Sequence, residues 1–320
     1  MPVPLRMAAF WSVYKVLDRR PVFQQPPDKV RKAANRRSLL MGMPLAWPIV
    51  GRTHSGVRVE HGRAVAGDGT ELRLRIHRPK NAGDGPLPVV VNFHGGGWVS
   101  GDLKHSEWWA STMAAEAEVL VISVDYRLAP EHAFPGPAED CYDATTWIAD
   151  HADELGADRH RLAVMGDSAG GNLAAVVTLM ARDRGAPDIA LQLLIYPTVD
   201  LAHSYPSVDE NANAPILGRK DIRRNAGNYF HNSAGDRTDP YASPLRAKHE
   251  GLPPALVQTA QFDPLRDEGA AYAEALRAAG VDAQYTNYLD AVHGYISLPG
   301  LVPEARKALT DAIEFVRRSL

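Results

Sequence analysis

The stretch from Val164 to Ala181, VMGDSAGGNLAAVVTLMA, decides how the rest of the chain is interpreted. It begins as the end of an apolar strand, passes through a cluster of small residues and continues as an apolar helix. One hydroxyl, that of Ser168, lies at the bend, between Gly166 and the pair Gly170 and Gly171. Small neighbours allow a strand and a helix to approach closely, so the stretch predicts a sharp turn that exposes Ser168.

Outward from this bend, short apolar runs alternate with helical stretches. Runs without polar alternation are typical of parallel strands covered on both faces. The first two segments do alternate and are joined by the turn residues AGDGT, which predicts an antiparallel hairpin. We expect strands at 57–65, 71–79, 87–93, 117–124, 161–166, 190–196, 254–260 and 283–289, and helices around 106–116, 138–153, 168–183, 266–279 and 303–320. This order predicts an α/β fold with an open, mostly parallel sheet of about eight strands that starts antiparallel.

Two regions do not fit this alternation. Residues 1 to about 50 read as helices interrupted by prolines, and residues 200–252 are polar, rich in Asn and Pro, and carry no strand pattern. A gap of that length is usually an insertion or a lid. We expect both regions to pack together as a helical cap over one edge of the sheet. The predicted division is 1–50 and 200–250 for the cap, and 51–199 and 251–320 for the core.

The composition limits the classes of function. The 320 residues are 45% hydrophobic and 23% charged, which is ordinary for a globular protein, and the net charge of −3 calls for neither nucleic acid nor an acidic membrane as partner. No run of about 18 apolar residues predicts a membrane span, and the N-terminus reads as mature protein. The single cysteine, Cys141, excludes an internal disulfide and favours a reducing, cytoplasmic compartment. Its helical context predicts a packed thiol rather than a nucleophile.

Ligands of open parallel sheets bind beyond the carboxyl ends of the strands, so chemistry is expected there. Ser168 follows such a strand end. The pattern Gly166-x-Ser168-x-Gly170 between a strand and an apolar helix is typical of a nucleophile at a strained turn. The following helix N-terminus favours an oxyanion beside the hydroxyl. The alternative is that Ser168 merely caps the helix.

A serine hydroxyl needs a base, usually a histidine that a carboxylate orients. Asp263 and His293 each follow one of the last two strands, in the order serine, acid, histidine that this topology requires. One helix and one strand fit between them and would return His293 to the same sheet edge. Asp267 and Asp290 compete for the role of the acid. Asp263 is preferred over Asp267 because it lies nearest the strand end, and the short spacing of Asp290 from His293 does not imply hydrogen-bond geometry.

The segment from Asn92 to Asp102, NFHGGGWVSGD, directly follows the strand at 87–93. Three glycines let the backbone direct its N–H groups inward, and fixed donors of this kind are worth roughly 3 kcal/mol each to a developing oxyanion. A phosphate-binding loop is disfavoured, because no Lys-Ser/Thr follows and the G-x-G-x-x-G spacing is absent. His94 has no second ligand at metal spacing, so we expect it to buttress the loop and expect no metal site.

Five sequence motifs together show a resemblance to a known protein family. HGGGW (94–98), DYRLAPEHAFP (125–135), GDSAGG (166–171), DPLRDEG (263–269) and HG (293–294) occur in this order. From about residue 57 to residue 320, the chain resembles the hormone-sensitive-lipase-like (family IV) esterases of the α/β-hydrolase fold. The resemblance implies that fold, with a helical cap built from the N-terminal segment and an insertion after the sixth strand.

The resemblance also implies roles for residues of this chain. Ser168 would be the nucleophile, His293 the base and Asp263 its orienting acid. The oxyanion donors would be the backbone N–H groups of Gly96, Gly97 and Ala169. Asp125 and Arg127 would hold the oxyanion loop and the neighbouring turn by ion pairs and hydrogen bonds. We further expect an apolar acyl pocket with the aromatic side chains of Trp98 and Tyr196. The cap would add Phe10, Trp11 and Tyr14, and the alternative for these three is that they form the cap's own core.

These roles predict a serine carboxylesterase that hydrolyses small-molecule esters of short to medium chain length through an acyl-enzyme, without a metal or organic cofactor. An amidase or carbamate hydrolase on the same triad remains an alternative, because the cap selects the leaving group. A non-catalytic small-molecule receptor is disfavoured by the presence of His293. An exposed last strand could pair edge to edge into a homodimer.

Overall fold

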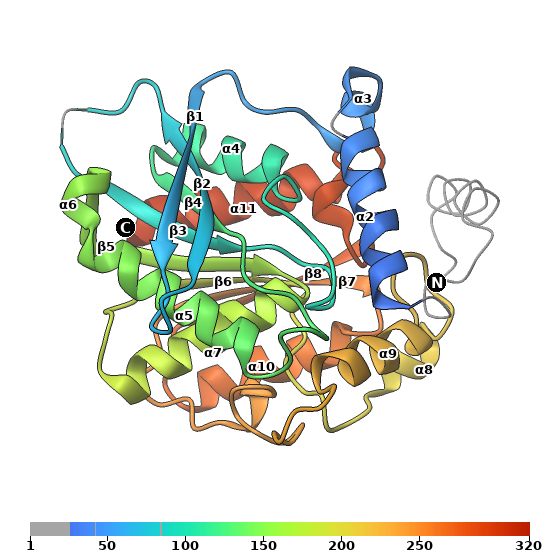
Figure 1. The fold of residues 1–320 in the computed structure, drawn as a ribbon. Helices are drawn as coiled ribbons and strands as arrows, with labels where there is room; N and C mark the ends of the chain where they lie inside the picture. Colours follow the sequence, from blue (N-terminus) through green and yellow to red (C-terminus); the bar gives the residue numbers. More distant parts are fainter. Residues whose placement is uncertain (1–25, 42, 84) are drawn as a thin grey trace.

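The computed structural model describes residues 26–320 except 42 and 84, and in this part of the chain an eight-stranded sheet forms the centre (Figure 1). Its strand order is β1-β2-β4-β3-β5-β6-β7-β8. The pairs β1/β2 and β2/β4 are antiparallel, and every other neighbouring pair is parallel, as the sequence predicts. The strands are β1 (Val57–Val65), β2 (Glu71–Pro79), β3 (Leu87–Phe93), β4 (Leu120–Val124), β5 (Ala157–Asp167), β6 (Leu191–Ile195), β7 (Ala255–Phe262) and β8 (Ala283–Val292).

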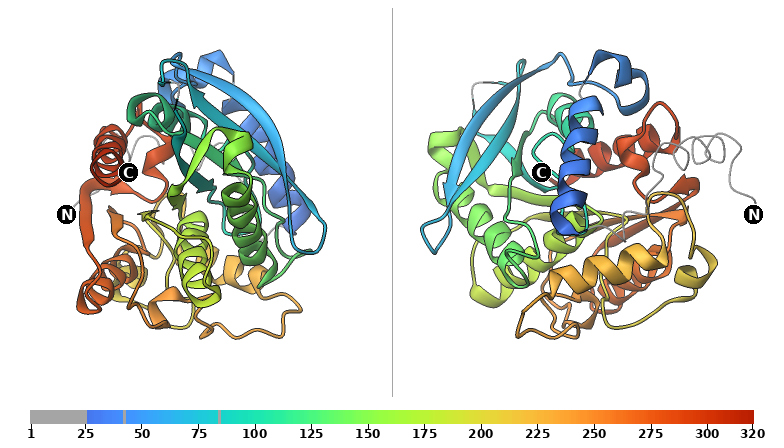
Figure 2. Two further views of the ribbon diagram at one scale, coloured as in Figure 1. Left: turned by 90° about the vertical axis from the view of Figure 1, so that its left-hand side faces the viewer. Right: turned by 45° about the vertical axis from the view of Figure 1, so that its right-hand side comes forward.

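Helices cover both faces of this sheet (Figure 2). On β3, Val89 and Val91 belong to the hydrophobic core that includes α5, α7 and α10, whereas Val90 belongs to the core that includes α4 and α11. Alternate residues of one strand therefore enter two different cores, which is why these strands read as continuous apolar runs. The helices are α4 (Glu107–Ala117), α5 (Gly136–Asp150), α6 (Ala152–Leu155), α7 (Ala169–Arg184), α10 (Arg266–Ala278) and α11 (Glu304–Ser319).

The polar insertion, residues 200–252, contains no strand in the structure, as expected. It holds the helices α8 (Pro206–Glu210) and α9 (Arg219–Tyr229) and a 3₁₀ turn, Pro244–Arg246. Of the N-terminal region, the structure describes α2 (Pro27–Met41), a 3₁₀ turn (Pro44–Ala46) and α3 (Trp47–Val50). Helices α2, α8 and α9 lie on the side where β7 and β8 end (Figure 1). The division of the chain into cap and core stays a prediction.

Arg31 fixes α2 to this side of the molecule. Its guanidinium donates hydrogen bonds to the carbonyl oxygens of Val99, at 3.1 Å, and Ala129, at 2.9 Å. It also pairs with Glu131 at 2.7 Å. The helix is therefore attached to the segments that follow β3 and β4.

Candidate active site

Ser168 lies between β5 and α7, at the sharp bend that the sequence predicts. Its backbone has φ 57° and ψ −118°, a conformation that residues other than glycine rarely adopt. A Cβ at Gly166 would lie 2.2 Å from the carbonyl oxygen of Gly170, and a Cβ at Gly170 would lie 2.0 Å from that of Phe93. Both obstacles are backbone atoms. The glycines are therefore required because strand, turn and helix are in direct contact.

The hydroxyl of Ser168 is hydrogen-bonded to a histidine that is itself bound to a carboxylate. Oγ of Ser168 lies 2.9 Å from Nε2 of His293, and Nδ1 of His293 lies 2.7 Å from Oδ2 of Asp263. Asp263 is fully buried and His293 is 5% exposed. They directly follow β7 and β8, which are adjacent and parallel, so their strand ends meet at one edge of the sheet. The structure thus brings together the three residues that the sequence analysis selected.

The carboxylate of Asp263 is fixed on both of its oxygens. While Oδ2 faces His293, Oδ1 accepts a hydrogen bond from the backbone N–H of Leu265 at 2.9 Å. Because each oxygen has its own donor, the carboxylate cannot rotate without losing a hydrogen bond. With Nδ1–H of His293 donating to Asp263, Nε2 is left as the acceptor for the serine hydroxyl.

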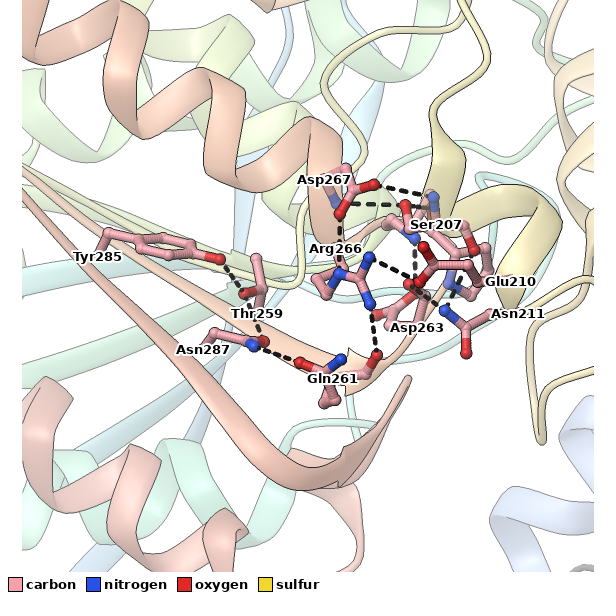
Figure 3. Close-up of polar contacts among 12 residues, drawn as sticks. Ser207, Glu210, Asn211, Thr259, Gln261, Asp263, Arg266, Asp267, Tyr285 and Asn287 are labelled. Carbon is pink, nitrogen blue, oxygen red and sulfur yellow. Dashed lines mark hydrogen bonds and ion pairs between the residues drawn. The ribbon is translucent and has the colours of Figure 1, made fainter. Parts of the chain in front are cut away.

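The acid loop, residues 263–267, is docked on α8 of the insertion (Figure 3). Oδ2 of Asp267 accepts the N–H of Ser207 at 2.9 Å, and the Ser207 hydroxyl donates to the carbonyl oxygen of Pro264 at 2.8 Å. Arg266 pairs with Asp267 and with Glu210 of α8, at 2.8 Å each. Asp267, the competing carboxylate, therefore binds the insertion. The other competitor, Asp290, is exposed on β8.

The glycine loop, residues 94–98, provides backbone N–H groups next to Ser168. Gly96 and Gly97 have φ values of 119° and 63°. A Cβ at Gly96 would lie 2.1 Å from the carbonyl oxygen of Ser100, so only glycine fits there. In the described part of the chain, no hydrogen bond engages the backbone N–H of Gly96, Gly97 or Ala169. These three groups are the candidate oxyanion donors that the resemblance implies.

The segment 125–135 supports the glycine loop, but not through the residues expected from the resemblance. Asp125 pairs with an arginine of β2 at 2.5 Å, and Arg127 pairs with the buried Asp140 of α5 at 2.6 Å. Tyr126, between them, stacks on the ring of His94 with centroids 4.4 Å apart and donates its hydroxyl to the His94 carbonyl oxygen at 2.6 Å. The expectation for Asp125 and Arg127 is therefore wrong for the glycine loop; their ion pairs hold the segment 125–135 itself to β2 and α5. Neighbouring side chains of an extended segment point to opposite sides, and the loop is reached by Tyr126.

His94 buttresses the loop, as predicted. It is 2% exposed, and its Nδ1 lies 2.8 Å from the carbonyl oxygen of Gly95. Burial lowers the pKa of His94, which keeps the ring neutral near pH 7. Among the residues that the structure describes, no group of His, Cys, Asp and Glu side chains is arranged to hold a metal ion.

Cys141 is fully buried on α5, and burial raises the pKa of its thiol well above the usual range. A thiol in that state is a poor nucleophile, so the prediction of a packed residue is confirmed. Within the described ranges, no helix is long and apolar enough to cross a membrane.

A cavity with about 280 Å³ of empty space, part of it open to solvent, lies beside Ser168. Most of its wall is apolar, and the insertion contributes one side. The lining residues are Gly97, Trp98, Ser168, Ala169, Thr198, Leu201, Leu217, Ile222 and Asn225. The sequence analysis missed the last five. For Leu217 and Ile222, apolar residues in a polar tract are the signal that could have found them.

Of the aromatic residues predicted to line the pocket, the structure places one in the cavity wall and one outside it. Trp98 lines the cavity and stacks on Tyr229 of α9 with ring centroids 4.3 Å apart. Tyr196 does not line it. It is fully buried, and its ring packs against His293 at a centroid distance of 4.8 Å, so its expected place in the pocket is wrong. Phe10, Trp11 and Tyr14 lie outside the described residues.

Comparisons with known proteins agree with this architecture. A family model for the alpha/beta hydrolase fold matches residues 90–297. Over 309 residues the chain is 42% identical to the carboxylesterase NlhH of Mycobacterium tuberculosis, and the alignment covers 95% of this chain and 94% of the relative. It is 35% identical over 258 residues to an ethyl acetate hydrolase of Pseudomonas putida, covering 79% and 80% of the two chains.

The likeness extends to the complete fold. A hyperthermophilic esterase from the archaeon Pyrobaculum calidifontis matches with a TM-score of 0.91 at 36% identity, over 99% of both chains. The family model spans well over half of this chain, and the first relative aligns along nearly its full length. The chain therefore belongs to the hormone-sensitive-lipase-like (family IV) esterases of the α/β-hydrolase fold.

Proposed function

We propose that this protein is a serine carboxylesterase that hydrolyses short- to medium-chain carboxylic esters through an acyl-enzyme on Ser168. The observation that carries the proposal is the hydrogen-bonded chain from Ser168 through His293 to Asp263, next to a loop with unengaged backbone N–H groups. The names of the relatives support the reaction class, since they include a carboxylesterase and an ethyl acetate hydrolase.

In the first half of the reaction, Oγ of Ser168 attacks the ester carbonyl while Nε2 of His293 takes the hydroxyl proton. Asp263 stabilises the imidazolium that forms, because its Oδ2 accepts the Nδ1–H at 2.7 Å. His293 then gives the proton to the departing alcohol. In the second half, water repeats these steps on the acyl-enzyme and releases the acid.

The negative oxygen of each tetrahedral intermediate is assigned to the N–H groups of Gly96, Gly97 and Ala169. Gly96 and Gly97 belong to a loop held by His94 and Tyr126, and Ala169 is the first residue of α7. Donors fixed in advance need no reorganisation during the reaction, and each is worth about 3 kcal/mol. The positive end of the α7 dipole adds to their effect.

The chain-length preference is inferred from the cavity. The free space beside Ser168 is narrow, and part of it is open to solvent. Leu217 and Ile222 close one side of it. A short acyl chain fills such a space, whereas a long chain requires the wall to move.

The test is hydrolysis of p-nitrophenyl esters from acetate to palmitate by the wild type and by Ser168→Ala. We expect activity that is highest on short chains and falls by roughly 10⁴-fold or more in the variant, because removal of the nucleophile leaves only binding and oxyanion stabilisation. Activity that survives in the variant would contradict the assignment of Ser168. A p-nitroanilide with the same acyl group tests the amidase alternative, which is favoured if the anilide is cleaved faster than the ester.

Three other expectations stay predictions. A cytoplasmic location is supported by the single, buried cysteine. A homodimer through β8 is supported by the position of this strand at the edge of the sheet. The assignment of residues 1–50 and 200–250 to a cap is supported by the insertion residues that line the cavity.

A further inference from the structure

Asp167 is a buried carboxylate that the proposed mechanism does not use, although it directly precedes Ser168. It is 3% exposed. Its Oδ1 accepts the backbone N–H of Gly95 at 2.8 Å. Its Oδ2 lies 3.3 Å from Nε2 of His105 and 3.4 Å from the hydroxyl of Tyr196. The carboxylate next to the nucleophile is thus bound to the glycine loop.

The contact with the loop is also steric. A Cβ at Gly95 would lie 2.5 Å from Oδ2 of Asp167 and 2.9 Å from its carbonyl oxygen. Gly95 is followed directly by Gly96 and Gly97, the proposed oxyanion donors. The peptide that leads into the donors therefore contacts Asp167, which links the glycine loop directly to the residue before Ser168.

A buried carboxylate needs a partner, because an unpaired charge in a protein interior is strongly unfavourable. His105 supplies one from the segment between the glycine loop and α4, with a side chain that is 31% exposed. His94 and Tyr196 also face Asp167, and Asp102 faces His105. His105 is the nearest positive group among these.

The pKa shifts of Asp167 and His105 both favour an ion pair. Burial by itself raises the pKa of Asp167. His105 and the Gly95 N–H lower this pKa by more than burial raises it, so the net shift is downward. Burial by itself lowers the pKa of His105, but Asp167 outweighs this effect and the net shift is upward. Each group therefore favours the charged form of the other.

We propose that Asp167 is a positioning residue that fixes the oxyanion loop against the nucleophile turn, and that His105 is the counter-ion that holds it there. This inference rests on the proposed function. Donors act on the oxyanion only when they lie about 2.7–3.1 Å from it, and loss of one donor costs about 10²–10³ in kcat. Because the oxyanion is absent from the ground state and forms only in the transition states and tetrahedral intermediates, a displaced loop lowers kcat and leaves KM unchanged.

The primary test is Asp167→Asn, assayed with p-nitrophenyl acetate. Active sites are counted by titration with an activated phosphonate ester, which phosphonylates the Ser168 hydroxyl and releases its alcohol. The amide is neutral and has one acceptor oxygen. With that oxygen on the Gly95 N–H, it turns an N–H group toward His105 and cannot pair with the protonated imidazole. We expect kcat per site to fall about 10- to 100-fold with KM within about twofold of the wild type. The dissociation constant of a trifluoromethyl ketone, whose hemiketal oxygen occupies the oxyanion position, should rise by a similar factor.

A matched control is Asp311→Asn on α11, which removes a carboxylate that accepts the Tyr288 hydroxyl at 2.7 Å. It should leave kcat per site and ketone binding unchanged. Two variants of His105 test the counter-ion and remain informative if Asp167→Asn fails to fold. His105→Leu should lower kcat at constant KM, and His105→Gln, which keeps a side-chain N–H, should restore part of the loss.

The outcomes are distinguishable. If Asp167→Asn loses only titratable sites or thermal stability, while kcat per site and ketone affinity stay within about threefold, Asp167 is merely structural and the proposal is overturned. A rise in KM that accounts for the whole loss overturns it as well. If the wild type hydrolyses no ester, the proposed function fails before any variant is compared, and this inference falls with it.

Discussion

Replacement of Asp263 by asparagine is a direct test of the proposed hydrogen-bonded chain from Ser168 through His293 to Asp263, because the structure fixes how the new side chain would lie. Oδ1 of Asp263 accepts the Leu265 N–H at 2.9 Å, and Oδ2 faces Nδ1 of His293 at 2.7 Å. An asparagine would keep its carbonyl oxygen on the Leu265 N–H, since an NH₂ group there would oppose another donor. Its NH₂ group would then face Nδ1 of His293.

A donor opposite Nδ1 requires the tautomer of His293 that carries its proton on Nε2. That nitrogen then cannot accept the proton of Ser168, whose Oγ lies 2.9 Å away. In serine–histidine–aspartate triads, the same reversal of the histidine tautomer lowers kcat by about 10⁴-fold. We expect a similar fall here, which raises the activation free energy by about 5.4 kcal/mol at 1.36 kcal/mol per factor of ten. KM should change little, because no substrate contact is removed.

The assay is steady-state hydrolysis of p-nitrophenyl acetate, with circular dichroism and a thermal scan to confirm that Asp263→Asn is folded. The matched control is Asp267→Asn, from the same acid loop, whose carboxylate accepts the Ser207 N–H of α8. We expect this variant to lose less than tenfold in kcat. A folded Asp263→Asn enzyme within tenfold of the wild type would refute the reasoning, and so would an equal loss in both variants.

Two predictions concern stability. Gly170→Ala places a Cβ 2.0 Å from a backbone oxygen of β3, so we expect roughly 3 kcal/mol of destabilisation and a fall of roughly 5 °C in Tm. The control is Gly83→Ala, which has nothing within 4 Å of the new Cβ and should leave Tm unchanged. Equal Tm values for both variants would contradict the close-contact argument. Burial by itself raises the pKa of Glu107, but hydrogen bonds from His77 and Arg75 lower it below its usual range. The stabilising effect of the Glu107 carboxylate is therefore complete above the unfolded pKa of about 4.3 and is lost as pH falls. Glu107→Gln should lower Tm at pH 7 and make Tm less sensitive to pH between about 5 and 3. An unchanged pH sensitivity of Tm would show that Glu107 does not contribute to the pH dependence of stability.

The sheet and the arrangement of Ser168, Asp263 and His293 were predictable because their signals are local. Apolar runs mark the strands, and a polar residue directly after a parallel strand must lie at one edge of the sheet. The identification of Asp263 over Asp267 needed only its closeness to the strand end. Even the strained turn could be inferred, since glycines surround Ser168 on both sides.

The remaining parts of the site depend on contacts between distant segments. Nothing in the motif at 125–135 says that Tyr126, rather than its charged neighbours, reaches the glycine loop. Tyr196 follows a strand, as a pocket residue would, yet it lies buried against His293. Leu217 and Ile222 stand out as apolar residues in a polar tract, but the sequence alone does not indicate which segment of the core they face.

The attachment of α8 to the acid loop has a consequence for how this enzyme could diversify. Ser207, on α8, is bound to the loop that carries Asp263, whereas Ile222, on α9, borders the cavity. The insertion thus contains one helix that supports the acid loop and one helix that borders the cavity and packs on the glycine loop, through Tyr229 on Trp98. A change at Ile222 alone can alter substrate scope while α8 keeps its contacts with the acid loop, so selectivity can diverge at single cavity-lining positions without loss of the catalytic arrangement.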